Sequence, residues 1–153
     1  MKRLLTIVSL IGAVLTSWGQ TCPTDTVIFN GRIENAEYQV WIDMDFYHND
    51  VITPNQEIFG QVPGYFSAKR DTRKWIIVSA EIKGKSARLV ISNDYGSEDL
   101  EAKLTLERDS TFTLERLKGS TMKIVVGGKW VNIPKKLTFI RVAPKRSATR
   151  EKP

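Results

Sequence analysis

Apolar side chains recur at every second position along most of the chain between residues 26 and 142. This period of two is typical of β-strands that bury one face, whereas amphipathic helices repeat at 3.6 residues. The clearest alternation lies at 36–47, where one face would carry Tyr38, Val40, Ile42, Met44 and Phe46. Because no window in this region shows the helical period, we predict an all-β domain.

Turn-forming residues divide this region into short segments. Breaks occur at Gly31, Pro63-Gly64 and Gly127-Gly128, and the last pair predicts a tight hairpin. A charged stretch at 69–74 and the sequence NDYG at 93–96 predict two further turns. The segments with the strand pattern lie at 26–30, 36–47, 57–62, 65–68, 75–83, 87–91, 100–106, 111–117, 121–126, 129–133 and 137–142.

About nine or ten strands at a spacing of roughly ten residues, joined by short turns, are typical of an antiparallel meander. Parallel pairing would need long crossover connections, and no helical segment is present to form one. We therefore predict an antiparallel meander that forms a barrel or a strongly curved sheet. A closed barrel would also remove the exposed strand edges, and a β-sandwich is the alternative.

Three short motifs in the last third of the chain extend this prediction. They are LTLERDSTF at 104–112, GKW at 128–130 and LTF at 137–139. Together they resemble the closing strands of small secreted bacterial lipocalin-like domains, although Ser110 stands where those domains usually have glycine. The resemblance implies a β-barrel with Trp130 packed at one end. It implies no catalytic residue and no defined ligand.

The N-terminal segment differs in composition from the rest of the chain. Two basic residues precede an apolar run at 4–15, which is shorter than the ~20 residues that a membrane span needs. This order predicts a secretory signal peptide at 1–19, with the mature chain beginning at Gln20 and exported to the periplasm or out of the cell. Contact with the outer membrane is expected only if Cys22 is lipidated, and the residues before it match a lipoprotein signal poorly.

After the signal peptide we predict a single all-β domain at 20–142 and a disordered basic tail at 143–153. About 120 residues can bury a core without disulfide bonds, and a single cysteine allows no internal disulfide. The tail contains two prolines and four basic residues and has no apolar period. It accounts for much of the net charge of +6.

The sequence offers little catalytic chemistry. His48 is the only histidine, and no G-x-S-x-G, P-loop or G-x-G-x-x-G motif occurs. A cluster of Asp43, Asp45, His48 and Asp50 could hold a hard metal ion, but it lacks the spacing of a calcium loop. We favour the interpretation that these four residues belong to a solvated strand face and a polar turn. We expect no cofactor, no metal and no enzyme activity, with a hydrolase built on a carboxylate pair as the remaining alternative.

Four basic residues crowd the predicted turn at 69–74, between Phe66 and Trp75. Basic residues interleaved with aromatic ones occur in nucleic-acid-binding proteins. An exported protein does not share a compartment with the nucleic acids of the cytoplasm, so we expect no nucleic-acid partner. Acidic glycans or lipid head groups would be the complementary partners outside the cytoplasm, and a solvated turn is the simpler interpretation.

Trp41, Trp75 and Trp130 all fall on the more polar phase of their predicted strands. For Trp75, the opposite and more apolar phase would carry Ile76, Val78, Ala80 and Ile82. The rings either fill a second buried layer or line a cavity or groove, where aromatic side chains offer rigid contact area to a ligand. Our candidate ligand contacts, expected on one concave face, are Trp41, Tyr47 and Trp75.

These patterns leave three classes of function. The first is a secreted non-catalytic β-domain that binds a small apolar or sugar-like ligand in the bacterial cell envelope. The second is an envelope interaction module, either an inhibitor or the subunit of a complex, that contacts another protein. The third is a carboxylate-dependent hydrolase. A bound small molecule would favour the first, and a stable partner or a defined oligomer the second. Turnover that is lost on Asp43→Asn or Asp45→Asn would favour the third.

Overall fold

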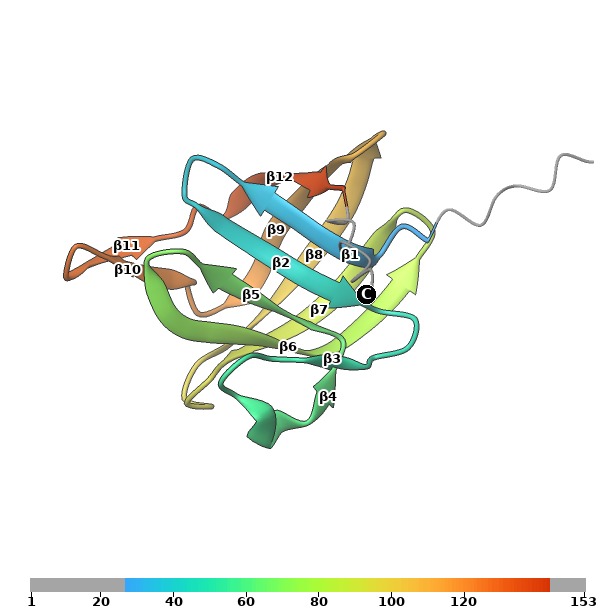
Figure 1. The fold of residues 1–153 in the computed structure, drawn as a ribbon. Helices are drawn as coiled ribbons and strands as arrows, with labels where there is room; N and C mark the ends of the chain where they lie inside the picture. Colours follow the sequence, from blue (N-terminus) through green and yellow to red (C-terminus); the bar gives the residue numbers. More distant parts are fainter. Residues whose placement is uncertain (1–26, 144–153) are drawn as a thin grey trace, which may run out of the picture.

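Eight antiparallel strands form a closed β-barrel (Figure 1). The structure is a computed structural model that describes residues 27–143. The barrel strands are β1 (Asn30–Asn35), β2 (Val40–Asp45), β5 (Gly64–Ala68), β6 (Asp71–Lys83), β7 (Ser86–Asn93), β8 (Asp99–Arg108), β9 (Thr111–Gly119) and β12 (Lys136–Val142). Each of these strands pairs with the next along the chain, and β12 returns to pair with β1. The predicted all-β antiparallel meander and its closure into a lipocalin-like barrel are confirmed.

Two small hairpins interrupt the meander. The first consists of β3 (Val51–Ile52) and β4 (Gln61–Val62), with a 3-10 turn at Glu57–Phe59 between them. The second consists of β10 (Lys123–Val126) and β11 (Lys129–Asn132). Within residues 27–143, no helix is both long enough and apolar enough to cross a membrane.

Alternating apolar residues of the barrel strands point inward and fill the barrel. Along β2 and just beyond it, Val40, Ile42, Met44 and Phe46 are all buried, as their shared phase predicts. Four further phenylalanines contribute the largest fully buried side chains, which are Phe29, Phe66, Phe112 and Phe139. Burying one such side chain stabilises a fold by about 1.5–3 kcal/mol, so this interior is the main source of stability.

A β-bulge overturns the expected faces of β6. The pairing of β6 with β7 shifts between Ile77 and Ser79, which leaves Val78 as an extra residue. One inserted residue moves every following side chain to the opposite face. Trp75 and Ile77 therefore face the interior before the bulge, whereas Ala80 packs against the interior after it and Val78 is 47% exposed. The prediction of one continuous apolar face along this strand was wrong.

Two of the predicted strands are also misplaced. Residues 27–29, the described part of the strand expected at 26–30, lie before β1, which begins at Asn30 and contains Gly31. Gly31, which was expected to end a strand, has a φ of 108°, a value that glycine adopts readily. The segment at 57–62 holds the 3-10 turn and only the two strand residues of β4.

The β3–β4 hairpin covers part of the outer wall of the barrel. Val51 and Val62 pack there against Tyr65 and Ile76, which form a second, smaller apolar cluster. Ile76 is therefore fully buried on the outside of the barrel. This cover explains why β6 is apolar on both faces in this region.

The β10–β11 hairpin lies across one end of the barrel (Figure 1). Its flanking and inward residues Met122, Ile124 and Ile133 are buried within the interior cluster. The predicted tight turn at Gly127-Gly128 is confirmed, and both glycines have positive φ angles of 58° and 76°. We call this end of the barrel, which also carries the turns that follow β1, β5 and β7, the hairpin end.

Several sequence predictions fall on residues that the structure does not describe. These are the signal peptide at 1–19, the mature terminus at Gln20, Cys22 and, apart from its first residue, the tail at 143–153. They lie outside the described residues and stay predictions.

Candidate functional site

The three predicted ligand contacts lie in different parts of the molecule. Trp75 is 5% exposed and belongs to the interior cluster, at the hairpin end. Trp41 is half-buried on the outward phase of β2, where it lines a hollow of the outer wall with Arg32. Tyr47 follows β2 at the opposite end, and its hydroxyl accepts hydrogen bonds from the backbone nitrogens that precede β1. The structure therefore does not bring them onto one concave face.

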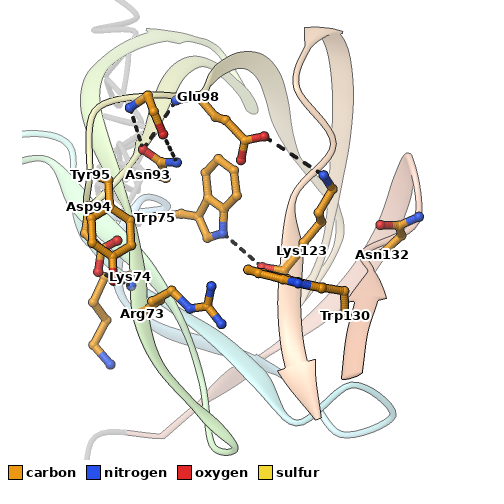
Figure 2. Close-up of a pocket in the computed structure, with 11 residues that line it drawn as sticks. Arg73, Lys74, Trp75, Asn93, Asp94, Tyr95, Glu98, Lys123, Trp130 and Asn132 are labelled. Carbon is orange, nitrogen blue, oxygen red and sulfur yellow. Dashed lines mark hydrogen bonds and ion pairs between the residues drawn. The ribbon is translucent and has the colours of Figure 1, made fainter. Parts of the chain in front are cut away.

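A pocket of about 620 Å³ opens at the hairpin end beside Trp75 (Figure 2). Three separate parts of the chain form its walls, namely the beginning of β6, the turn between β7 and β8, and the β10–β11 hairpin. Its volume lies within the usual range for small-molecule sites. Its aromatic residues are Trp75, Tyr95 and Trp130, and its polar residues include Asn93, Glu98, Lys123 and Asn132.

Trp75 forms the rigid floor of this pocket. Its ring is almost fully buried, and its indole Nε1 donates a hydrogen bond of 3.3 Å to the main-chain oxygen of Lys123 (Figure 2). This bond joins the barrel wall to β10. The register of the hairpin and the orientation of the indole therefore depend on each other.

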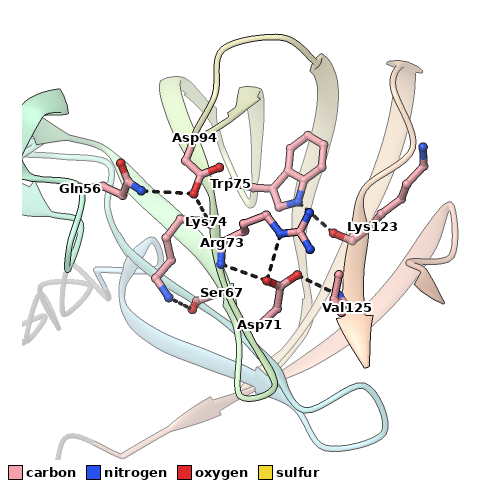
Figure 3. Close-up of polar contacts among 9 residues, drawn as sticks. All are labelled: Gln56, Ser67, Asp71, Arg73, Lys74, Trp75, Asp94, Lys123 and Val125. Carbon is pink, nitrogen blue, oxygen red and sulfur yellow. Dashed lines mark hydrogen bonds and ion pairs between the residues drawn. The ribbon is translucent and has the colours of Figure 1, made fainter. Parts of the chain in front are cut away.

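Asp71 fixes a second link between β6 and the hairpin (Figure 3). Its side chain is 5% exposed. One carboxylate oxygen accepts hydrogen bonds from the main-chain nitrogen and Nε of Arg73, at 3.0 and 3.2 Å. The other accepts a bond of 2.8 Å from the main-chain nitrogen of Val125. A single buried carboxylate thus holds both a cationic side chain of the pocket and the strand opposite it.

Trp130 and Arg73 form a stacked pair at the rim of the pocket. The guanidinium carbon of Arg73 lies 4.1 Å from the centroid of the indole ring, a geometry typical of a cation–π contact. Trp130 is nevertheless 61% exposed. The prediction that it packs at one end of the barrel was wrong, because its strand belongs to the hairpin and not to the barrel wall.

The turn between β7 and β8 is held by its own side chains. The Asn93 carboxamide oxygen accepts a hydrogen bond from the main-chain nitrogen of Ser97, at 3.0 Å. Asp94 accepts bonds from the main-chain nitrogen of Lys74 and from the amide of Gln56, at 3.1 and 3.2 Å. The polar turn predicted here is confirmed, and it presents Tyr95, which is 76% exposed, beside the pocket (Figure 2).

Lys123 and Glu98 provide opposite charges within the pocket. Their nearest nitrogen and oxygen atoms are 4.0 Å apart, and both side chains are about two-fifths exposed. A partly exposed pair at this distance contributes little to stability. Both groups therefore remain accessible to a ligand with hydroxyl or charged groups.

The acidic cluster considered for a metal ion instead stabilises local structure. Asp43 accepts hydrogen bonds from Nε and Nη2 of Arg32, at 2.8 and 2.6 Å, and from the hydroxyl of Tyr65, at 2.7 Å. Burial, together with the bond to Asp43, raises the pKa of Tyr65 to about 12. Among residues 27–143, no group of three or more His, Cys, Asp or Glu side chains is arranged to hold a metal ion.

Asp45 and His48 form the other half of that cluster. Asp45 accepts hydrogen bonds from the main-chain nitrogens of Tyr47 and His48, and so caps the turn after β2. Its second oxygen lies 2.8 Å from Nδ1 of His48, and this hydrogen bond raises the pKa of the imidazole. The polar turn that we favoured over a metal site accounts for these contacts.

The sequence pointed to only some of the other residues of the pocket. Trp130 was considered for a second buried layer or a cavity, and Arg73 lies in the basic stretch at 69–74 for which acidic glycans were considered beside a solvated turn. Lys123 was interpreted only as part of a hairpin, and Tyr95 as part of a polar turn. The Gly127-Gly128 signal correctly predicted the hairpin, but no local pattern indicates that it folds across the barrel end. That position depends on contacts such as the bond between Asp71 and Val125, which are 54 residues apart.

Comparisons with protein-family models, with curated proteins and with solved structures give no match to this chain. The barrel fold therefore rests on the strand pairing itself, which is that of a closed, antiparallel, eight-stranded barrel.

Proposed function

We propose that this protein is a non-catalytic, lipocalin-like barrel protein that binds a small sugar-like ligand in the pocket at its hairpin end. The observation that carries the proposal is the grouping of Trp75, Tyr95 and Trp130 around a space of about 620 Å³. Aromatic rings offer flat apolar area to the C–H faces of a sugar ring. The neighbouring amide, ammonium and carboxylate groups can bond its hydroxyls.

The lining of the pocket favours a sugar-like ligand over an apolar one. The barrel interior is filled by its own apolar side chains, so the available space lies at the rim. Glu98, Lys123 and Asn132 line this space, and polar groups that face solvent exchange their hydrogen bonds to water for those of a ligand. An apolar ligand would remove that water without replacing its hydrogen bonds, which costs free energy.

The carboxylates of the pocket support binding rather than hydrolysis. Asp94 already accepts a main-chain and a side-chain hydrogen bond, and Glu98 faces Lys123. A glycoside hydrolase needs one carboxyl that stays protonated as an acid and a second that acts as base or nucleophile. Asp94 is bonded to the main chain of β6 and Glu98 lies beside Lys123, so the contacts of both carboxylates are those of a polar binding surface.

The proposal includes export from the cytoplasm to the bacterial cell envelope or beyond it. It is supported by the order of basic, apolar and small residues at 1–19, which is that of a secretory signal peptide. A membrane attachment is proposed only for the case in which Cys22 is lipidated. For an exported protein, the sugars of the cell envelope would be the available ligands.

A second candidate function is an envelope protein–protein interaction module. It is favoured by the β11 strand, which pairs only with β10 among the described strands and exposes Trp130 beside its free edge. Such edges can accept an extended segment of another protein as an added strand. A stable partner or a multiple of the chain mass in native mass spectrometry would support this candidate instead.

The first experiment is a titration of the purified mature protein with a panel of neutral and acidic oligosaccharides, followed by tryptophan fluorescence and native mass spectrometry. We expect Trp130→Ala to weaken binding at least about tenfold, because a large stacking surface is lost. Trp41→Ala is the matched control, since Trp41 also stacks with an arginine but lies outside the pocket. The proposal fails if no saccharide binds or if both variants bind like the unchanged protein.

A further inference from the structure

We propose that the sugar-like ligand carries a carboxylate, as a uronic acid does, and that this carboxylate binds the outer edge of Arg73. The inference rests on the proposed sugar site and names the class of sugar that fits it. It depends on three features of the pocket, which are the orientation of Arg73, its unused donors and the charges around it.

Arg73 is held rigidly from one side only. Its main-chain nitrogen and Nε both donate to Asp71, which is buried and is bonded on its other oxygen to Val125. Among residues 27–143, the hydrogen bonds of the guanidinium run through Nε alone. The guanidinium carries five N–H donors in a planar fork, so the donors of Nη1 and Nη2 are available to a ligand.

The free edge of the guanidinium points into the pocket. Figure 2 shows Arg73 extending from β6 toward the space between Trp75 and Trp130. The guanidinium carbon lies 4.1 Å from the centroid of the Trp130 ring, and this contact holds the fork beside the indole. A carboxylate that accepts two parallel hydrogen bonds from this edge would therefore hold its sugar ring beside the two indoles.

Asp71 does not compete for this edge. Its carboxylate lies on the Nε side and is committed to Arg73 and to the main chain of Val125. Its negative charge offsets part of the positive potential of the guanidinium, while the hydrogen bonds to Arg73 hold that side chain in place. A pre-positioned fork loses less conformational entropy on binding than a mobile one.

The surroundings of the pocket add positive charge. Lys123 lies within the pocket and forms only a long contact of 4.0 Å with Glu98. Lys69, Arg70 and Lys129 are exposed at the same end of the barrel. The lining itself holds three basic residues, Arg73, Lys74 and Lys123, against the acidic Asp94 and Glu98. An excess of positive charge raises the local concentration of an anionic ligand and its rate of association.

The experiment compares ligands that differ only in their charge. Short oligomers of galacturonic acid and of glucuronic acid are each titrated as the free acid and as the methyl ester, by calorimetry. We expect at least one free acid to bind about tenfold or more tightly than its ester at low salt. This difference should shrink as salt is added, because part of the attraction is screened.

The variant Arg73→Lys tests the role of the fork. A lysine keeps a positive charge beside Asp71 but lacks the planar pair of donors. We expect it to lose most of the preference for the acid while the ester binds as before. Arg32→Lys is the matched control, because Arg32 also stacks on a tryptophan but uses its fork for Asp43. It should keep the full preference.

Equal binding of acid and ester by the unchanged protein would overturn this inference and leave the sugar site intact. Full preference for the acid in a folded Arg73→Lys would also overturn it. If this variant does not fold, the comparison of acid with ester on the unchanged protein decides. Failure of every saccharide in the panel, neutral ones included, would overturn the sugar site as well.

Discussion

Two arginine–tryptophan stacks on this barrel consist of the same residue types and differ in their hydrogen bonds. Arg32 lies over Trp41 on the outer wall, with its guanidinium carbon 5.2 Å from the ring centroid, and Arg73 lies over Trp130 at 4.1 Å. Arg32 fills its fork with two hydrogen bonds to Asp43. Arg73 uses Nε alone for its carboxylate and turns its free edge toward the pocket.

The difference shows that the hydrogen-bond state of a stacked pair indicates its role better than its residue types. In the first stack, Asp43 also accepts the hydroxyl of Tyr65, and Trp41 is half-buried. This is a closed clamp within the wall. In the second, Trp130 is mostly exposed and lies beside a pocket. We refer to the two as the closed clamp and the open stack.

The largest expected effect is a loss of unfolding free energy when the carboxylate that holds each arginine is removed. Asp71→Ala would leave the partly buried main-chain nitrogen of Val125 without its acceptor and Arg73 without its partner. We expect a loss of about 3 kcal/mol of unfolding free energy. Asp43→Ala should cost about 1 kcal/mol, because Asp43 and Arg32 are more exposed and water can replace the bonds.

Urea unfolding of both variants measures this difference. Asp71→Asn is a useful control, since its side-chain oxygen can still accept the bond from Val125, and it should lose less than the alanine variant. A greater loss for Asp43→Ala than for Asp71→Ala would contradict the view that Asp71 fastens the hairpin to the barrel.

Replacing the tryptophan of each stack should have opposite effects: Trp41→Ala should mainly reduce stability, and Trp130→Ala should mainly reduce saccharide binding. Trp41→Ala is expected to lower the unfolding free energy by about 2 kcal/mol, because it removes a half-buried ring from the wall. Trp130→Ala should cost about 0.5 kcal/mol, because the ring is 61% exposed. Thermal and urea unfolding test the stability half, and the saccharide titration tests the binding half. A Trp130→Ala protein that is less stable than Trp41→Ala would show that Trp130 is a structural residue.

The antiparallel meander could be predicted from the sequence because its signals are local. The alternation at 36–47 correctly assigned the buried face of β2, and Gly127-Gly128 correctly marked a hairpin. Short turns between strands require antiparallel neighbours. Closure depends on the pairing of β12 with β1, which are distant in sequence, so the sequence left a barrel, a curved sheet and a sandwich open.

The phase of Trp75 could not be predicted in the same way. Ile76, Ile77 and Val78 are all apolar, so the sequence fits either register of β6. The choice is made by the bulge at Val78 and by the β3–β4 hairpin, which buries Ile76 on the outer wall. Both depend on pairing with other strands, and neither leaves a local signal in the pattern.

The pocket was missed for a related reason. Trp75, Tyr95 and Trp130 come from a strand, a turn and a hairpin that are distant in sequence. Their meeting depends on the placement of the hairpin across the barrel end, which Asp71 and the indole of Trp75 secure. Of the three residues chosen from the sequence as ligand contacts, the structure places only Trp75 in this pocket.

The smallest expected effect is a pH dependence of stability that arises in the closed clamp, at Tyr65. Burial and the hydrogen bond to Asp43 raise the pKa of Tyr65 to about 12, so the folded protein favours the neutral phenol. The stability that this group contributes is complete below about pH 10, the usual pKa of tyrosine, and is lost as the pH rises toward 12. Ultraviolet titration should show one of the four tyrosines ionising late. Tyr65→Phe or urea should remove this late phase, and a late phase that persists in Tyr65→Phe would assign it to a tyrosine outside the clamp.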